Sequence, residues 1–304
     1  MKIKITSDST CDLSAELLQK NDISLFPLTV IKDDKAYSDG ITITTDEIFA
    51  HVAAGGDLCT TTAGSMGEYM DLFTKYASNN DAVIHISLSS ELSSSYQNAC
   101  LAADEFTNVT VIDSRNLSTG QGLVVLKACE MAKSGASVEE IKETVTAYTE
   151  KVEASFLLDQ LGYMVKGGRC SAVAALGANL LGLKPCIEVK GGRCSTVAAL
   201  GANLLNLKPC IEVKNGKLGV VKKYRGNYAK CLSSYVKERL ADRDDLDKNT
   251  LFVTHTPVTD DCLQAVKNAV DACADFENIY WTKAGCTISC HCGPGTLGVL
   301  FVKK

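Results

Sequence analysis

The stretch that decides the fold is Ala82-Val83-Ile84-His85-Ile86-Ser87-Leu88-Ser89-Ser90. An apolar run passes directly into a serine-rich loop, as in a buried parallel strand whose carboxyl end opens into a loop. The same order recurs where Lys2–Ile5 leads into Thr6–Thr10, and where Val109–Ile112 leads into Asp113–Gly120. These stretches predict strands near 2–6, 82–87 and 108–112.

Helical patterns alternate with these strands. They are predicted near 13–20, 45–54, 65–78, 95–105, 120–134 and 137–152. The last pattern opens with a capping box, Ser137 with Glu140 three residues later. Alternating strands and helices favour a parallel sheet flanked by helices. Residues 1–152 are therefore predicted to form an N-terminal α/β domain.

Residues 153–304 show a different order of predicted elements, in which strands follow one another closely. Asn215-Gly216 separates two of them and is typical of a two-residue hairpin turn. This half is predicted to be a C-terminal α/β domain with a mixed, largely antiparallel sheet plus helices. The strands are expected near 154–158, 209–213, 218–224, 250–255, 278–283 and 297–302, and the helices near 226–241 and 259–274.

A tandem duplication interrupts the second domain. Residues 165–188 and 189–212 are near-identical copies of 24 residues that differ at Ala172/Thr196 and Gly182/Asn206. Two copies are too few for a solenoid, which needs about three or more. The repeat indicates a recent duplication, natural or introduced, and only one copy can fill a given place in a packed core.

Composition excludes several classes of function. The chain has 304 residues, a net charge of −5 and no basic run, which argues against a nucleic-acid partner. No apolar stretch reaches transmembrane length, and MKIKITSDST is unlike a signal peptide, so a cytoplasmic location is expected. The 14 scattered cysteines are expected to be reduced and buried.

The hydroxyl-rich loops predict a ligand site. The carboxyl ends of parallel strands share one edge, where ligands bind, and a further cluster, Thr60–Ser65, precedes a helix. Small neutral donors suit a small polar or anionic head group. The same residues also suit plain helix N-caps, so both interpretations stay open.

The carboxy-terminal motifs point away from nucleotides and metals. Gly293–Gly298 matches G-x-G-x-x-G, but only six residues follow it, so a turn into the last strand is expected instead. Read as a strand, Cys286–Cys292 separates His291 from the cysteines, and no metal site is expected. His291 is a candidate donor to an anion, or else a structural cap of the turn.

The other histidines are given structural roles. His85 and His255 are expected to be strand residues satisfied by backbone groups, and His51 is expected to be exposed.

Together these motifs resemble the DegV family of bacterial fatty-acid-binding proteins over nearly the whole chain. Each motif alone is weak, but their order and spacing are highly specific. The matching stretches are Thr6–Ser9, Pro27–Val30 with Tyr37–Gly40, Thr61–Ser65, Ser89–Gln97, Val111–Ser114, Gly167–Arg169 with Leu183–Pro185, and His291–Gly295.

The resemblance implies a lipid held between two α/β domains, with its carboxylate bound by Thr61, Ser93 and His291 and its acyl chain in an apolar tunnel. It implies a carrier rather than an enzyme, without a cofactor. Some family members present the fatty acid to a separate kinase that makes an acyl phosphate. Transient contact with a membrane surface is compatible with this role.

Three departures from the family pattern affect the site. Thr62 stands where serine is usual, Gly64 where proline is usual, and Ser94 replaces a glycine. The further ligand-binding candidates are therefore Thr60, Thr62, Ser65 and Gly293. We expect the duplication to perturb the surface of the second domain and to leave the head-group loops intact.

The alternative function is a phosphotransferase or hydrolase that acts on a small anionic substrate with Ser93 and His291. That function needs a base within reach of the serine, and normally a metal or nucleotide site. Chain length and saturation of the lipid depend on tunnel packing, which no sequence pattern encodes.

Overall fold

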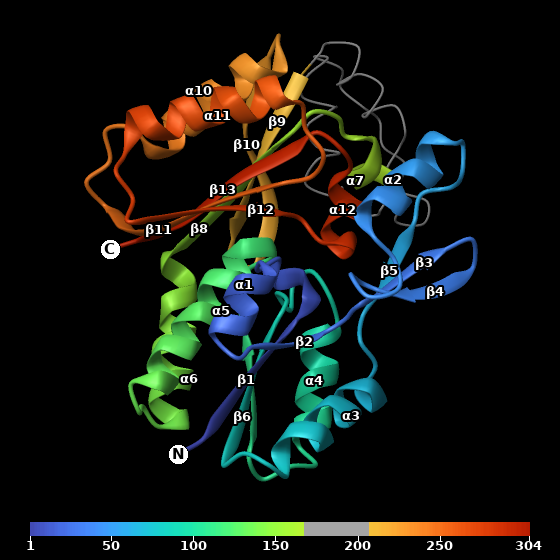
Figure 1. The fold of residues 1–304 in the computed structure, drawn as a ribbon, viewed down its shortest axis with the longest axis vertical. Coiled ribbons are helices and arrows are strands. Elements are labelled where there is room, and N and C mark those ends of the chain that lie inside the picture. The colour runs from blue at the N-terminus through green and yellow to red at the C-terminus, as the bar shows by residue number, and fades with distance from the viewer. Residues whose placement is uncertain (167–206) are drawn as a thin grey trace, which may run out of the picture.

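The computed structural model describes residues 1–166 and 207–304. Figure 1 shows one sheet in the lower half of the molecule, a second sheet in the upper half, and a smaller sheet beside them. Residues 167–206, which make up most of the two 24-residue copies, lie outside the described residues, and so do the expectations that fall on them.

The lower sheet is parallel, as predicted. Its order is β2-β1-β6-β7. Figure 1 places α5 and α6 on one side of it and α3 and α4 on the other. The strands are β1 (Ile3–Asp8), β2 (Ser24–Phe26), β6 (Ala82–Ser87) and β7 (Val109–Asp113), and the helices are α1 (Ala15–Lys20), α3 (Met66–Ala77), α4 (Ser95–Ala103), α5 (Ser118–Lys133) and α6 (Val138–Tyr148).

The upper sheet has six strands in the order β10-β9-β8-β13-β11-β12. Only β11 and β12 run parallel, so the sheet is mixed and largely antiparallel, as predicted. Asn215 and Gly216 form the expected hairpin turn, with φ angles of 51° and 77°. The elements are β8 (Val152–Leu158), β9 (Leu207–Lys214), β10 (Lys217–Arg225), α10 (Tyr228–Leu240), β11 (Leu246–His255), α11 (Asp260–Cys273), β12 (Asn278–Lys283) and β13 (Thr296–Lys303).

A three-stranded antiparallel sheet, which the sequence did not predict, lies beside the main body. Its order is β4-β3-β5, and it packs with α2 against α12, which also contacts α7 (Figure 1). The strands are short and largely polar, so they lack the apolar run that marks the main strands. These elements are β3 (Thr29–Lys32), β4 (Lys35–Ser38), α2 (Thr45–Ala53), β5 (Thr60–Thr62), α7 (Gly162–Lys166) and α12 (Cys286–Cys292).

The strand predicted at Cys286–Cys292 was wrong, because this segment is the helix α12. Its first amides donate to two carboxylates from the other end of the chain, Asp12 and Asp39. Helical spacing puts Cys286 and Cys290 on one face, against the small sheet. The glycine turn into β13 is confirmed, since Gly293 and Gly295 have φ angles of 73° and 75°.

The helix α5 joins the two halves of the molecule. It contacts β1 and β6 of the lower sheet and β8, β11 and β13 of the upper sheet. Gly122 lets α5 lie close to the Ser9–Cys11 segment that follows β1, since a Cβ there would lie 2.8 Å from the carbonyl oxygen of Cys11. One apolar core therefore continues from the lower sheet to Val213, Phe252 and Leu300 of the upper sheet. In the described ranges no helix has the length and apolarity to cross a bilayer.

Candidate functional site

A cavity of about 60 Å³ lies between α12, the small sheet and the loop that follows β6. Residues that carry a hydroxyl or imidazole group form one part of its wall, namely Thr61, Thr62, Ser93, Thr287 and His291. Apolar side chains form the rest, among them Leu28, Leu88, Leu92, Leu117, Phe156 and Ile288. The cavity is large enough for several water molecules or a small head group.

Thr61 and His291 meet across the cavity wall. Thr61 Oγ1 lies 2.7 Å from Nε2 of His291. The pairing of Val30 in β3 with Thr61 in β5 fixes the threonine, while His291 sits in the last turn of α12. Both side chains are partly buried, so the contact is shielded from bulk water.

Ser93 is held by its own loop. Its Oγ lies 2.9 Å from Oγ of Ser95, and it also accepts a hydrogen bond from the Ser95 amide at 3.1 Å. Ser95 Oγ in turn accepts the Gly64 amide at 3.4 Å, and Asn98 donates to the Gly64 carbonyl at 2.7 Å. These contacts tie the Ser93 loop to the Thr60–Ser65 segment.

Asp8 anchors the start of the same loop from beneath. The carboxylate is fully buried and accepts hydrogen bonds from the Leu88 amide at 2.8 Å and from the hydroxyls of Ser87 and Tyr69. Burial alone would raise the pKa of Asp8, but the contact with His85 and these hydrogen bonds hold the pKa below its usual value. The backbone partner expected for His85 was wrong, since its ring contacts Asp8 and Thr6 side chains.

The remaining sequence candidates fall into two groups. Thr62 lines the cavity, whereas Thr60, Ser65 and Gly293 are not among its lining residues. Ser65 is an exposed N-cap that forms a capping box with Glu68 at the start of α3. Gly293 ends α12 with a positive φ. Within this loop, Ser65 therefore has the N-cap role, whereas Thr61 and Thr62 line the cavity.

A second, more apolar cavity of about 30 Å³ adjoins the first. The two share Leu117, Phe156, Ile288 and Cys292 in their walls, and the second continues toward Ala154, Val213 and Leu300. Burial raises the pKa of the Cys292 thiol to about 12, so this side chain is uncharged at neutral pH. A cavity with a partly polar wall thus adjoins a more apolar one.

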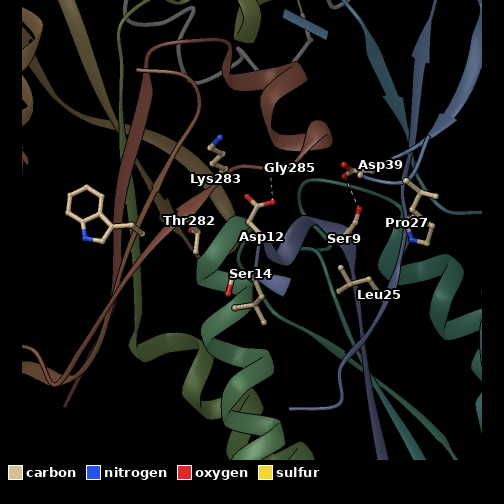
Figure 2. Close-up of a pocket in the computed structure, with 13 residues that line it drawn as sticks. Ser9, Asp12, Ser14, Leu25, Pro27, Asp39, Thr282, Lys283 and Gly285 are labelled. Atoms are coloured by element: carbon tan, nitrogen blue, oxygen red, sulfur yellow. Dashed lines mark hydrogen bonds between the residues drawn. The ribbon is translucent and has the colours of Figure 1, made fainter. Parts of the chain in front are cut away.

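A larger groove of about 410 Å³ lies on the other side of α12, at its amino end (Figure 2). None of the sequence candidates lines it. Figure 2 shows Asp12 and Asp39 near the groove floor, where Asp12 accepts the Gly285 amide and Asp39 accepts the Ser9 hydroxyl. Because protein donors already engage these carboxylates, we take the smaller cavity as the candidate site.

The comparison with known protein families shows the family to which the chain belongs. A model of the DegV family, described as uncharacterised, matches residues 2–190 and again residues 189–304. The chain belongs to the DegV family. The match restarts where the second predicted copy begins, as a tandem duplication requires. A DegV domain-containing protein of Clostridium acetobutylicum is 31% identical, over 100% of this chain and 99% of that protein.

Solved DegV structures share the whole fold. One from Thermus thermophilus, described as fatty acid binding, has a TM-score of 0.85 and 26% identity, and each chain is covered to 100%. One from Thermotoga maritima, described as revealing fatty acid binding function, has a TM-score of 0.78 and 25% identity, with 99% of each chain covered. One from Eubacterium ventriosum, described as binding stearic acid, has a TM-score of 0.76 and 25% identity, covering 99% of this chain and 98% of that one.

Sequence reasoning missed most of the wall of the cavity in this DegV protein. Thr287 and Ile288 line it together with His291 and Cys292, a spacing of one and four residues that only a helix produces. Had the segment been recognised as helical, this periodicity would have found them. The leucines follow strand ends, where no local pattern separates a tunnel wall from ordinary core.

Two smaller expectations are also resolved. His51 is not exposed, since only 17% of its side chain is accessible and its Nε2 lies 3.5 Å from Asp33. His255 is satisfied by a backbone group, the Thr256 carbonyl, as expected. Across residues 1–166 and 207–304, no cluster of three or more His, Cys, Asp or Glu residues is arranged for a metal ion.

Proposed function

We propose that this chain binds a long-chain fatty acid and presents it to a separate fatty-acid kinase for acyl-phosphate formation. The observation that carries the proposal is the division of the cavity wall into a polar part and an apolar part, four residues of which also line a second, more apolar cavity. A molecule with one polar end and a long apolar tail matches that division.

In this proposal Thr61, Ser93 and His291 hold the carboxylate. A buried carboxylate must accept hydrogen bonds, because an unpaired charge in an apolar interior is very costly. Hydroxyl and imidazole groups are suitable donors, and hydrogen bonds to a charged acceptor are the stronger kind. Thr62 is a further candidate, since it lines the same cavity.

The acyl chain supplies most of the affinity. Burying about sixteen carbons at about 0.8 kcal/mol per CH₂ gives on the order of 10 kcal/mol before the costs of association. The head-group contacts then set orientation. Because a carrier of this kind holds the carboxylate without activating it, the phosphoryl transfer is assigned to the kinase.

A cytoplasmic location is part of the proposal. Free cysteines are spread through the described residues, most of them buried. Such thiols stay reduced in the cytosol.

The test is denaturing extraction of the purified chain, followed by mass spectrometry of the released lipid. We expect about one fatty acid per chain, or uptake of that amount when palmitic acid is added to delipidated protein. Repeated extractions without lipid, together with no uptake, would overturn the proposal. Turnover of a small phosphorylated substrate by the isolated chain would support the enzyme alternative instead.

The kinase step has its own test. Loaded protein, ATP and a bacterial fatty-acid kinase are expected to yield acyl phosphate. Acyl phosphate formed at the same rate without this chain would contradict the presenting role.

A further inference from the structure

Asp39 is a buried carboxylate outside the cavity that no function described so far uses. Its side chain is only 5% exposed, and it directly follows β4. Figure 2 shows Asp39 and Asp12 near Gly285, just before the start of α12. Neither lines the cavity, but α12 carries His291 at its far end.

Asp39 accepts four hydrogen bonds from two segments. The amides of Cys286 and Thr287 donate to it at 2.9 and 3.3 Å, and the Thr287 hydroxyl donates at 2.7 Å. The hydroxyl of Ser9 donates at 2.8 Å. The Asp39 carboxylate thus caps the first turn of α12, whose early amides have no partner within the helix.

The same residue is tied to the strand that carries Thr61. Asp39 follows β4, which pairs with β3 through Tyr37 and Val30. Val30 pairs on its other side with Thr61 in β5. A closed ring therefore runs from Asp39 through the small sheet to Thr61, across to His291, and back along α12 to Asp39.

Apolar packing fills the interior of this ring. Two cysteines of α12, Cys286 and Cys290, pack in one apolar cluster with residues on the side of the small sheet, which are Val30, Ile43, Ile48 and Cys59. Asp12 adds a second attachment by accepting the Gly285 amide at 2.9 Å. Removal of the Asp39 carboxylate would leave α12 packed and still attached to Asp12 at Gly285, but it would free the amides of Cys286 and Thr287. A short helix held less firmly at this end can then shift or rotate about its axis.

We propose that Asp39 is a positioning residue that sets the alignment of His291 with Thr61 and thereby the selectivity of the site for a free carboxylate. This inference rests on the proposed fatty-acid function. Thr287 connects Asp39 to the cavity. The residue lines the cavity, and its hydroxyl donates a hydrogen bond to Asp39.

The experiment measures the ratio of affinities for palmitic acid and methyl palmitate. In Asp39→Ala we expect the ratio to fall about tenfold, the order of a hydrogen bond to a charged group, while the affinity for the ester changes little. In a His291→Ala background the same substitution should have no further effect, since residues that act as one unit are not additive.

A separate variant controls for the loss of stability that Asp39→Ala could cause. Asn227→Ala removes the cap of α10, where the Asn227 side chain accepts the Lys230 amide at 3.1 Å, and Asn227 does not line the cavity. This variant should lose stability and keep the acid-to-ester ratio. Asp39→Asn, which retains one acceptor oxygen, provides a folded variant with a loss in the same direction if Asp39→Ala does not fold.

Two results would overturn the inference, and they are distinguishable. A wild-type ratio that is retained in folded Asp39→Ala or Asp39→Asn would reject the positioning role and leave the proposed function standing. A wild-type chain that binds the acid and the ester equally well would reject the carboxylate clamp itself, and the inference with it.

Discussion

Thr61 and His291 are 230 residues apart in the chain, and yet their side chains are in contact. One of the two groups donates to the other, so each satisfies part of the hydrogen-bonding capacity of its neighbour. In the proposed function, the carboxylate must compete with this contact. The expected net gain from the proposed clamp is therefore smaller than the sum of its new hydrogen bonds.

Thr61→Val tests the clamp at a single atom. The substitution preserves shape and removes the hydroxyl, so we expect palmitic acid to bind roughly tenfold to a hundredfold more weakly, following about 1.5–3 kcal/mol for a hydrogen bond to a charged group. Methyl palmitate should bind nearly as before. Isothermal titration of both ligands gives the comparison.

Thr60→Val is the matched control for that experiment. Thr60 is an exposed residue on the same short strand and does not line the cavity. Its substitution should leave the affinities for both ligands unchanged. Equal losses for the two variants, or equal losses for acid and ester in Thr61→Val, would contradict the role of Thr61.

The end of α12 is the element most sensitive to substitution. Gly293 has φ 73° and ψ 175°, a region that glycine alone adopts at low cost. A Cβ there would lie 2.5 Å from the ring of Tyr163. We expect Gly293→Ala to lower the free energy of unfolding by about 1–3 kcal/mol, measured by urea denaturation.

A second glycine provides the contrast. Gly67 lies within α3 and has open space at its Cβ position. Gly67→Ala should be neutral or stabilise the protein by up to about 1 kcal/mol, because alanine favours the helix. If the two substitutions had the same effect, backbone conformation at Gly293 would not be the reason for its glycine.

The main elements were predictable because each has a strong local signal. Apolar runs marked the strands, and Ser137 with Glu140 marked the start of α6, which the structure confirms as a capping box. The segment Cys286–Cys292 had no such local signal. Its alternating cysteines and isoleucine match a strand as well as a helix, and the carboxylates that cap it come from Asp12 and Asp39.

At the scale of the molecule, the candidate site exists only where both halves meet. Thr61 and Ser93 come from the first half and His291 from the second, and the cavity walls alternate in the same way. The family resemblance singled out these three residues, and the fold brings them to one cavity. The apolar wall was beyond prediction, because it depends on how β8, β10 and α12 pack together.

Asp12 links the two halves, and its buried carboxyl group is expected to make the stability of the fold depend on pH. It is 7% exposed, its carboxyl accepts the Ser118 hydroxyl at 2.6 Å, and it also caps Gly285. Burial raises the pKa of Asp12 from 3.8 to about 8, and the neighbouring Asp39 adds to the rise. The folded chain thus holds a proton that the unfolded chain releases between these two pKa values.

The sign of the effect follows from that proton. The contribution of Asp12 to stability is complete below a pH of 3.8 and is lost as the pH rises toward about 8, with a slope of at most about 1.4 kcal/mol per pH unit. Asp12→Asn mimics the protonated form and should remove this slope. In urea unfolding from pH 5 to pH 8, the free energy of unfolding of the variant should therefore increase relative to that of the wild type as the pH rises. Parallel curves over that range would mean that Asp12 does not take up a proton on folding.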